Sequence, residues 1–162
     1  MTEEDITRLA RVLGRACRRR DVDLVTAESC TGGEAAAAIT RISGSSKWFE
    51  RGFVTYTNLA KKEMLGVSRR TLGEHGAVSE EVAREMAAGA LKQSRADVSV
   101  AITGIAGPTG GSRKKPVGLV YFGWGVRNGP IQTRVFRFGG DRAEIRRQSV
   151  AVALQGLIDL LR

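Results

Sequence analysis

Apolar residues recur at helical spacing near both ends of the chain. Between residues 4 and 20 they lie three or four positions apart, which predicts an amphipathic helix. A second long helix is predicted to start after Asp141, a suitable N-cap, and to run to about residue 161. Shorter helices are predicted between them, over 32–41, 59–65, 69–74 and 80–94.

Capping signals mark the starts of three of the shorter helices. Thr31 and Glu34 have the spacing of a capping box. Asn58 is the expected cap of the helix that contains Lys61, and Ser79 is followed by two acidic residues, as is common in a first helical turn.

Five apolar or alternating segments predict strands, over 21–26, 50–56, 97–102, 117–126 and 131–138. The last two are joined across Asn128-Gly129-Pro130, which predicts a hairpin-like turn. Helices separate the earlier strands, so we predict an α/β fold in which helices cover both faces of a mixed sheet. A length of 162 residues fits one domain, spanning 1–162. Right-handed crossovers would bring the loops 27–33 and 103–116 to the carboxyl ends of strands, where α/β sheets bind ligands.

Composition narrows the classes of function. Lys and Arg number 26 against 17 Asp and Glu, a net charge of +9 that favours anionic partners. Two cysteines, Cys17 and Cys30, and one histidine, His75, are too few for a disulfide framework or a zinc site, so we predict neither a metal nor a cofactor. The acidic N-terminus and the lack of a long apolar run predict a cytoplasmic protein with no membrane partner.

The segment 28–33, Glu-Ser-Cys-Thr-Gly-Gly, places Ser29 between a strand end and a glycine-rich helix start. Free N–H groups at such a start can hold a developing oxyanion or a phosphate. The alternative is an ordinary strand-to-helix turn. Cys30 is a rival nucleophile, although a small buried side chain is the commoner role for such a cysteine.

Lys61 is predicted in the first turn of its helix, where a cation opposes the helix dipole. The dipole and the neighbouring Lys62 would lower the pKa of Lys61, as a general base requires. The alternative is a pair of solvated surface lysines.

Two further segments contain candidate anion-binding groups. Residues 103–112 form a glycine-rich loop that could cradle a nucleotide, or serve only as a flexible connection, and it lacks the dinucleotide and P-loop fingerprints. Arg142 is predicted at the start of the last helix, with Arg146 one turn further on the same face. An anion at this helix start would bind both arginine and free N–H groups, although a solvated helix rich in arginine is the alternative.

Four of these segments together resemble the CinA C-terminal domain family, and the resemblance covers nearly the whole chain. They are Glu-Ser-Cys-Thr-Gly-Gly at 28–33, Tyr-Thr-Asn-x-x-Lys at 56–61, Gly-Ala-Val-Ser at 76–79 and Thr-Gly-Ile-Ala-Gly-Pro-Thr-Gly-Gly at 103–111. The family includes nicotinamide-nucleotide amidases. The resemblance implies a stand-alone member with a three-layer α/β/α sandwich and a mixed, mostly parallel sheet.

The resemblance also implies a serine–lysine amidohydrolase that converts nicotinamide mononucleotide to nicotinate mononucleotide and ammonia. Ser29 matches the nucleophile and Lys61 the base, with Tyr56 beside them, and N–H groups from Thr31 to Gly33 would hold the oxyanion. The expected substrate-binding residues are Thr31, Gly32, Gly33, Asn58, Thr103, Gly104, Gly107 and Arg142. The expected partner is this anionic small molecule, and the expected assembly is a homo-oligomer, a dimer.

Two alternatives belong to other classes. One is a catalytically silent module that binds nucleotides or DNA, which the net charge and the family's association with competence favour. The scattered arginines lack the aromatic residues that usually accompany a nucleic-acid surface, so nucleic acid is the less expected partner. The other alternative is a hydrolase that depends on Cys30.

Overall fold

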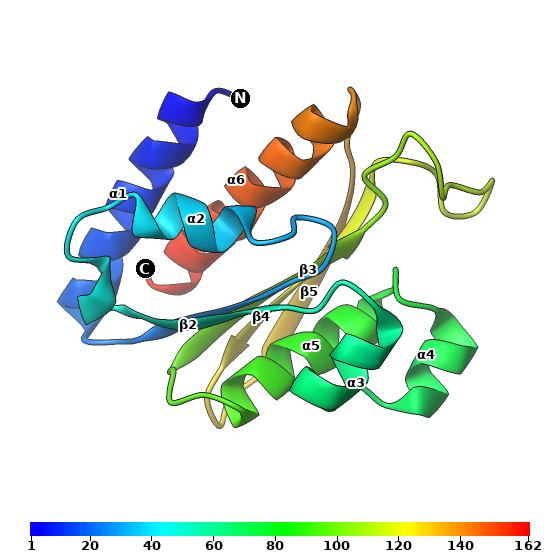
Figure 1. Cartoon of the computed structure of the whole chain (residues 1–162). Coiled ribbons are helices and arrows are strands. Elements are labelled where there is room, and N and C mark those ends of the chain that lie inside the picture. Colours follow the sequence, from blue (N-terminus) through cyan, green and yellow to red (C-terminus); the bar gives the residue numbers. More distant parts are fainter.

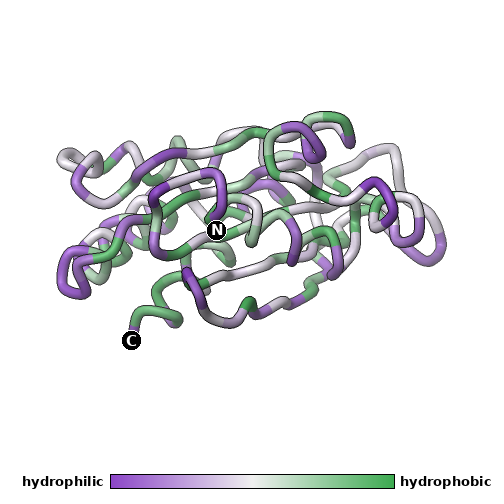
Figure 2. Tube along the Cα trace, turned by 90° about the horizontal axis from the view of Figure 1, so that it is seen from below, coloured by the Kyte–Doolittle hydropathy of each residue, from purple (hydrophilic) through white to green (hydrophobic).

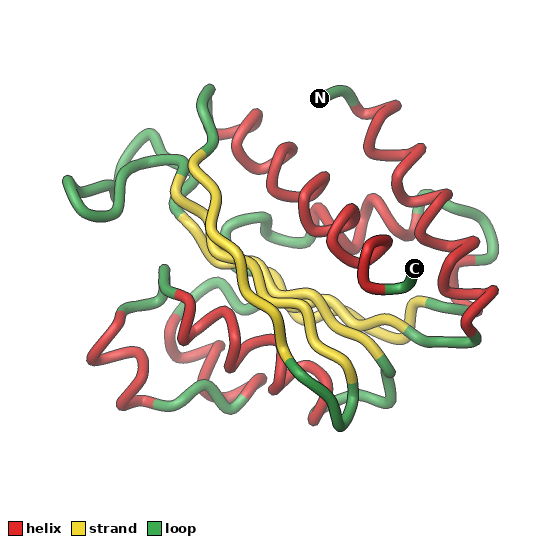
Figure 3. The backbone as a smooth tube through the Cα atoms, turned by 180° about the vertical axis from the view of Figure 1, so that it is seen from behind, coloured by secondary structure: helices red, strands yellow, loops and turns green.

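A five-stranded sheet lies between two layers of helices in the computed structural model, which describes all residues 1–162 (Figure 1). On one face lie α1 (Glu3–Arg20), α2 (Glu34–Thr40) and α6 (Arg142–Leu160). On the other lie α3 (Asn58–Leu65), α4 (Arg69–His75) and α5 (Glu80–Lys92). A short 3₁₀ helix, η1 (Ser45–Lys47), leads into the second strand. The view from behind shows the strands enclosed by helices on both sides, which confirms the three-layer sandwich (Figure 3).

The sheet has the order β2-β1-β3-β4-β5. Its strands are β1 (Leu24–Glu28), β2 (Phe49–Val54), β3 (Val98–Gly104), β4 (Leu119–Val126) and β5 (Ile131–Arg137). β1 pairs in parallel with both β2 and β3, whereas β4 is antiparallel to β3 and β5. Only β4 therefore runs against the others, which confirms a mixed sheet with mostly parallel strands.

Each face of the sheet has its own apolar core. On β3, Val100 and Ile102 belong to the larger core beneath α1, α2 and α6, whereas Ala101 belongs to the smaller core beneath α5. This alternation follows from the two-residue repeat of a strand. The most hydrophilic stretches lie towards the outside of the trace (Figure 2). None of the helices combines the length and the apolar character that a membrane crossing requires.

The predicted cap of α2 is wrong. Its N-cap is Gly33, with φ +105°, and no side chain caps it. The hydroxyl of Thr31 instead donates to Glu28 Oε1 at 2.6 Å. The physical reason is that the Glu28 carboxylate already accepts N–H groups of this helix start, so no capping box forms.

The predicted cap of α3 is displaced by one residue. Thr57 has extended backbone angles and its Oγ1 accepts from the N–H of Ala60, so Asn58 is the first helical residue. Both residues favour caps, and the extended conformation of Thr57 decides between them. The caps predicted at Ser79 and Asp141 are confirmed.

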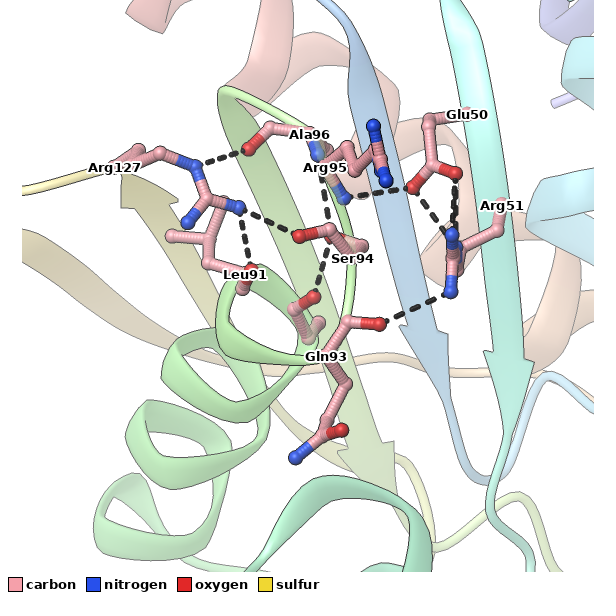
Figure 4. Close-up of polar contacts among 9 residues, drawn as sticks. Glu50, Arg51, Leu91, Gln93, Ser94, Arg95, Ala96 and Arg127 are labelled. Atoms are coloured by element: carbon pink, nitrogen blue, oxygen red, sulfur yellow. Dashed lines mark hydrogen bonds and ion pairs between the residues drawn. The ribbon is translucent and has the colours of Figure 1, made fainter.

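The carboxyl ends of β1, β2 and β3 meet at one edge of the sheet, and the loop 105–118 projects from it (Figure 1). A polar network closes the opposite edge (Figure 4). There the Arg127 guanidinium donates to the carbonyls of Leu91, Ser94 and Ala96, and so fixes the end of α5 against the strands.

Candidate active site

Ser29 and Lys61 lie in hydrogen-bonding contact at the carboxyl edge of the sheet. Ser29 directly follows β1 and Lys61 is on α3, and Lys61 Nζ lies 2.9 Å from Ser29 Oγ. Both side chains are buried, and Lys61 is only 1% exposed. The fold therefore brings a hydroxyl and an amine together across 32 residues of chain.

The environment of Lys61 is suited to a neutral amine. Its Nζ also donates to the carbonyl of Thr55 at 3.0 Å, which fixes the direction of the amine. Burial lowers the pKa of Lys61 from its ordinary value, and Cys30 opposes this to a smaller extent. The alternative of a pair of solvated surface lysines is wrong, because Lys61 is buried and Lys62 is half-buried. Burial, rather than repulsion from Lys62, is the physical cause of the lowered pKa.

Backbone hydrogen bonds hold the turn that carries Ser29. The Ser29 N–H donates to the carbonyl of Ile102 on β3, at 2.9 Å. The Gly32 N–H donates to the carbonyl of Ser29 at 3.0 Å, so it is not free for an oxyanion as predicted. Within the predicted range, the N–H groups of Thr31 and Gly33 have no acceptor in the protein. Neither residue lines the cavity beside Ser29, so these two groups do not face the place of an oxyanion, whereas the N–H of Cys30 also has no acceptor and belongs to a residue that does line it.

Cys30 is a poor nucleophile here. The side chain is buried at the cavity wall, and burial raises the pKa of its thiol to about 12. Since the thiolate is the reactive form, almost none is present near neutral pH. The prediction of a small buried side chain is confirmed.

A cavity of about 280 Å³ opens beside the serine and the lysine. The predicted site residues that line it are Ser29, Tyr56, Asn58, Lys61, Thr103, Gly104, Gly107 and Arg142. Its wall also contains Cys30, Ala77, Val78, Ile105, Ala106, Thr109 and Gly110. Segments far apart in the sequence therefore converge on one cavity.

Arg142 connects two walls of the cavity. One guanidinium nitrogen donates to the carbonyl of Gly107 and another to the Tyr56 hydroxyl, each at 2.8 Å. Tyr56 is 56% exposed, and its hydroxyl has no bond to Ser29 or Lys61. Thr103 is buried, and its hydroxyl donates to the carbonyl of Ala77 at 2.8 Å. Arg142 and Tyr56 thus lie at the rim, while Thr103 fixes the cavity floor to the segment before α5.

The residues that follow Cys30 in the turn lie outside the cavity wall. Thr31, Gly32 and Gly33 do not line the cavity, and the Thr31 side chain is fully buried against Glu28. Arg146 donates to the carbonyl of Thr31 at 3.1 Å and pairs with Glu34, so it braces this turn instead of extending the anion site at Arg142.

Two features of the site lie beyond the predicted residues. The first is the Glu28 carboxylate, which is 1% exposed and accepts three hydrogen bonds. Its sequence signal is an acidic residue that ends a buried strand just before a glycine-rich helix start. The second is the Thr55 carbonyl that orients Lys61, and backbone groups leave no signal in residue types. Nowhere do three His, Cys, Asp or Glu side chains gather around a point where a metal ion could sit.

Comparison with known proteins identifies the family. The model of the CinA C-terminal domain matches residues 6–161. The chain is 55% identical over 157 residues to an Escherichia coli K12 protein named nicotinamide-nucleotide amidohydrolase PncC, with 97% of this chain and 95% of that protein covered. A Pseudomonas putida protein of the same name is 50% identical over 157 residues, covering 97% and 98%. The solved structure of the competence/damage inducible protein CihA from Agrobacterium tumefaciens has a TM-score of 0.95 at 51% identity, covering 98% of this chain and 96% of that one. The chain therefore belongs to the CinA C-terminal domain family.

Proposed function

We propose that this protein is an amidohydrolase that converts nicotinamide mononucleotide to nicotinate mononucleotide and ammonia through an acyl-enzyme on Ser29. The observation that carries the proposal is the contact of 2.9 Å between Ser29 Oγ and a buried lysine amine at the wall of a cavity. The relatives named nicotinamide-nucleotide amidohydrolase support the choice of substrate.

The first half of the reaction forms the acyl-enzyme. Ser29 Oγ forms a bond to the amide carbon, its proton passes to neutral Lys61 Nζ, and the carbonyl electron pair moves to oxygen. The backbone N–H of Cys30, which has no acceptor in the protein and belongs to the cavity wall, would hold this oxyanion, a contribution of about 3–4 kcal/mol per donor in other hydrolases. The oxyanion then collapses, the C–N bond breaks, and the departing ammonia takes the proton from Lys61.

The second half returns the enzyme to its starting state. A water molecule gives a proton to Lys61 and attacks the ester carbon. The bond from carbon to Ser29 Oγ then breaks, and Oγ takes the proton back from Lys61. The Thr55 carbonyl keeps the amine directed at Ser29 through both halves, because it accepts one of the amine's N–H groups.

The ribose and the phosphate would lie towards the rim. Arg142 is the arginine in the cavity wall, which also contains Gly104 at the end of β3 and Gly107 in the loop that follows. An arginine beside exposed N–H groups suits a phosphate. Tyr56 and Asn58 complete the same wall, and the carboxamide would point inwards towards Ser29.

The proposal includes the setting of the enzyme. We infer that one domain, spanning 1–162, works in the cytoplasm as a homodimer, with the nucleotide as its small-molecule partner. Light scattering during gel filtration measures the assembly directly: twice the chain mass supports the dimer, and the mass of one chain of 17.4 kDa rejects it.

The test is release of ammonia from nicotinamide mononucleotide, with nicotinate mononucleotide identified by chromatography. We expect release by the natural protein and a loss of several orders of magnitude in Ser29→Ala. Full activity in that variant would reject Ser29 as the nucleophile. Steeply salt-dependent DNA binding with no ammonia release would instead favour the nucleic-acid alternative.

A further inference from the structure

We propose that the buried carboxylate of Glu28 is a positioning residue, which holds Ser29 in reach of Lys61 by fixing the turn between β1 and α2. The inference rests on the proposed function, since it concerns the reactivity of the same serine. Glu28 does not line the cavity, so it acts through the turn and not by contact with substrate.

The carboxylate binds the turn from inside. Glu28 Oε1 accepts from the Thr31 hydroxyl at 2.6 Å and from the Ala35 N–H at 2.8 Å, and Oε2 accepts from the Ala36 N–H at 3.0 Å. These bonds connect the last residue of β1 to the first turn of α2, across the segment that contains Ser29 (Figure 1). A charge at a helix N-terminus interacts favourably with the free N–H groups there, which compensates for its burial.

The backbone of the same residue is connected to the base. The Glu28 carbonyl accepts from the Thr55 N–H at 2.8 Å, the Thr55 carbonyl accepts from Lys61 Nζ, and Lys61 Nζ contacts Ser29 Oγ. Together with the peptide bond from Glu28 to Ser29, these hydrogen bonds form a closed ring that includes the nucleophile and the base. A shift of Glu28 would change the distance between Oγ and Nζ.

A neutral amide cannot replace the carboxylate fully. In Glu28→Gln the side-chain oxygen can still accept from Thr31 and Ala35, but the NH₂ group faces the Ala36 N–H, and two donors cannot bond. Losing this contact would release the start of α2 and with it the turn. A displacement of about 1 Å can reduce a rate by 10²-fold, so we expect kcat to fall by about 10- to 100-fold.

The experiment measures four quantities on the intact protein. They are kcat and KM for nicotinamide mononucleotide, the pH dependence of kcat, and the rate at which a small phosphonofluoridate labels Ser29. In labelling, the Oγ–P bond forms, fluoride leaves and the serine proton passes to Lys61, so no nucleotide is needed. We expect kcat and the labelling rate to fall together in Glu28→Gln. KM should stay within about twofold of the natural value, and the pH at which kcat changes should stay the same.

Glu85→Gln is the matched control. Glu85 on α5 also binds a helix start, because it accepts from the Ser68 N–H at 2.7 Å and from the Thr71 hydroxyl at 2.5 Å, and it does not line the cavity. We expect this variant to keep the natural kcat and labelling rate. Thr31→Val removes one donor to Glu28 with little change in shape, and it should reduce both rates by a smaller factor.

Several results would overturn the proposal. One is a kcat and a labelling rate in Glu28→Gln equal to those of the natural protein. Another is a change in KM alone. A third is a changed pH dependence of kcat with an unchanged labelling rate. If Glu28→Gln does not fold, natural rates in Thr31→Val would decide against it. Labelling of the natural protein without ammonia release would reject the proposed substrate and leave this inference to be settled by the labelling rates. Absence of labelling in the natural protein would reject the inference as well.

Discussion

Replacing Lys61 with methionine separates the effect of the buried amine on folding stability from its role as the catalytic base. Methionine has similar length and no charge, and Lys61 is almost fully buried. Burial lowers the pKa of Lys61 below its ordinary value of 10.5, so the unfolded chain binds this proton more tightly than the folded protein does. Between the folded pKa and 10.5, lowering the pH therefore destabilises the natural protein.

The size of the effect follows from proton linkage. In that window the free energy of unfolding changes by about 1.4 kcal/mol per pH unit from this group alone. For a domain of this size that corresponds to about 3–6 °C in Tm per pH unit. Above pH 10.5 the amine is neutral in both the folded and the unfolded protein, so its burial no longer destabilises the fold in this way. Methionine, however, leaves the Thr55 carbonyl without the hydrogen-bond donor that Lys61 supplies. That loss costs the variant about 1–3 kcal/mol.

We therefore expect the stabilities of the two proteins to depend differently on pH. Within the window below 10.5, the Tm of the natural protein should rise with pH relative to that of Lys61→Met, because only the natural protein has the buried amine. Its kcat should fall by about 10²- to 10⁴-fold, the usual contribution of a general base. The assay is thermal unfolding of both proteins from pH 7 to pH 10.5, with ammonia release measured on the same samples. Parallel stability curves would refute the argument that the amine is held desolvated.

Three further substitutions test separate parts of the site. Lys61→Arg should release no ammonia, because arginine stays protonated at working pH and cannot accept the serine proton, and an active variant would exclude lysine as the base. Arg142→Ala should mainly raise KM for nicotinamide mononucleotide, and an unchanged KM in steady-state kinetics would leave the arginine only its bonds to Gly107 and Tyr56. Cys30→Ala should keep kcat within a few-fold, because the thiol is protonated near neutral pH, whereas loss of ammonia release in a folded variant would revive the cysteine mechanism.

Most helices and strands could be predicted from the sequence because their boundaries carry local signals. The helix over Glu3–Arg20 and the caps at Ser79 and Asp141 follow from periodicity and side-chain chemistry, which act over a few residues. The capping box predicted for α2 is wrong because Glu28, a residue of the preceding strand, accepts from the Thr31 hydroxyl and from the helix start. The order of the strands also depends on long-range packing and has no local signal.

The site can be predicted from the sequence only in part, because several of its contacts join residues that are far apart in the chain. Local rules place a lysine beside another lysine on the surface, and they favoured a solvated role for Lys61. Its burial comes from packing against Ser29 and Thr55, which only the folded chain brings near. The role of Glu28 has no clear local signal, because a glutamate is ordinarily exposed and its three partners come from the turn and the helix start that follow it.

The central claim is that Ser29 and Lys61 act as one unit, and the double variant Ser29→Ala/Lys61→Met tests it most directly. Its kcat for release of ammonia from nicotinamide mononucleotide is compared with the values for both single variants. Groups that act together are strongly non-additive, so the double variant should be no slower than the slower single variant. If the two losses multiply instead, the serine and the lysine contribute independently and the account of the dyad is wrong.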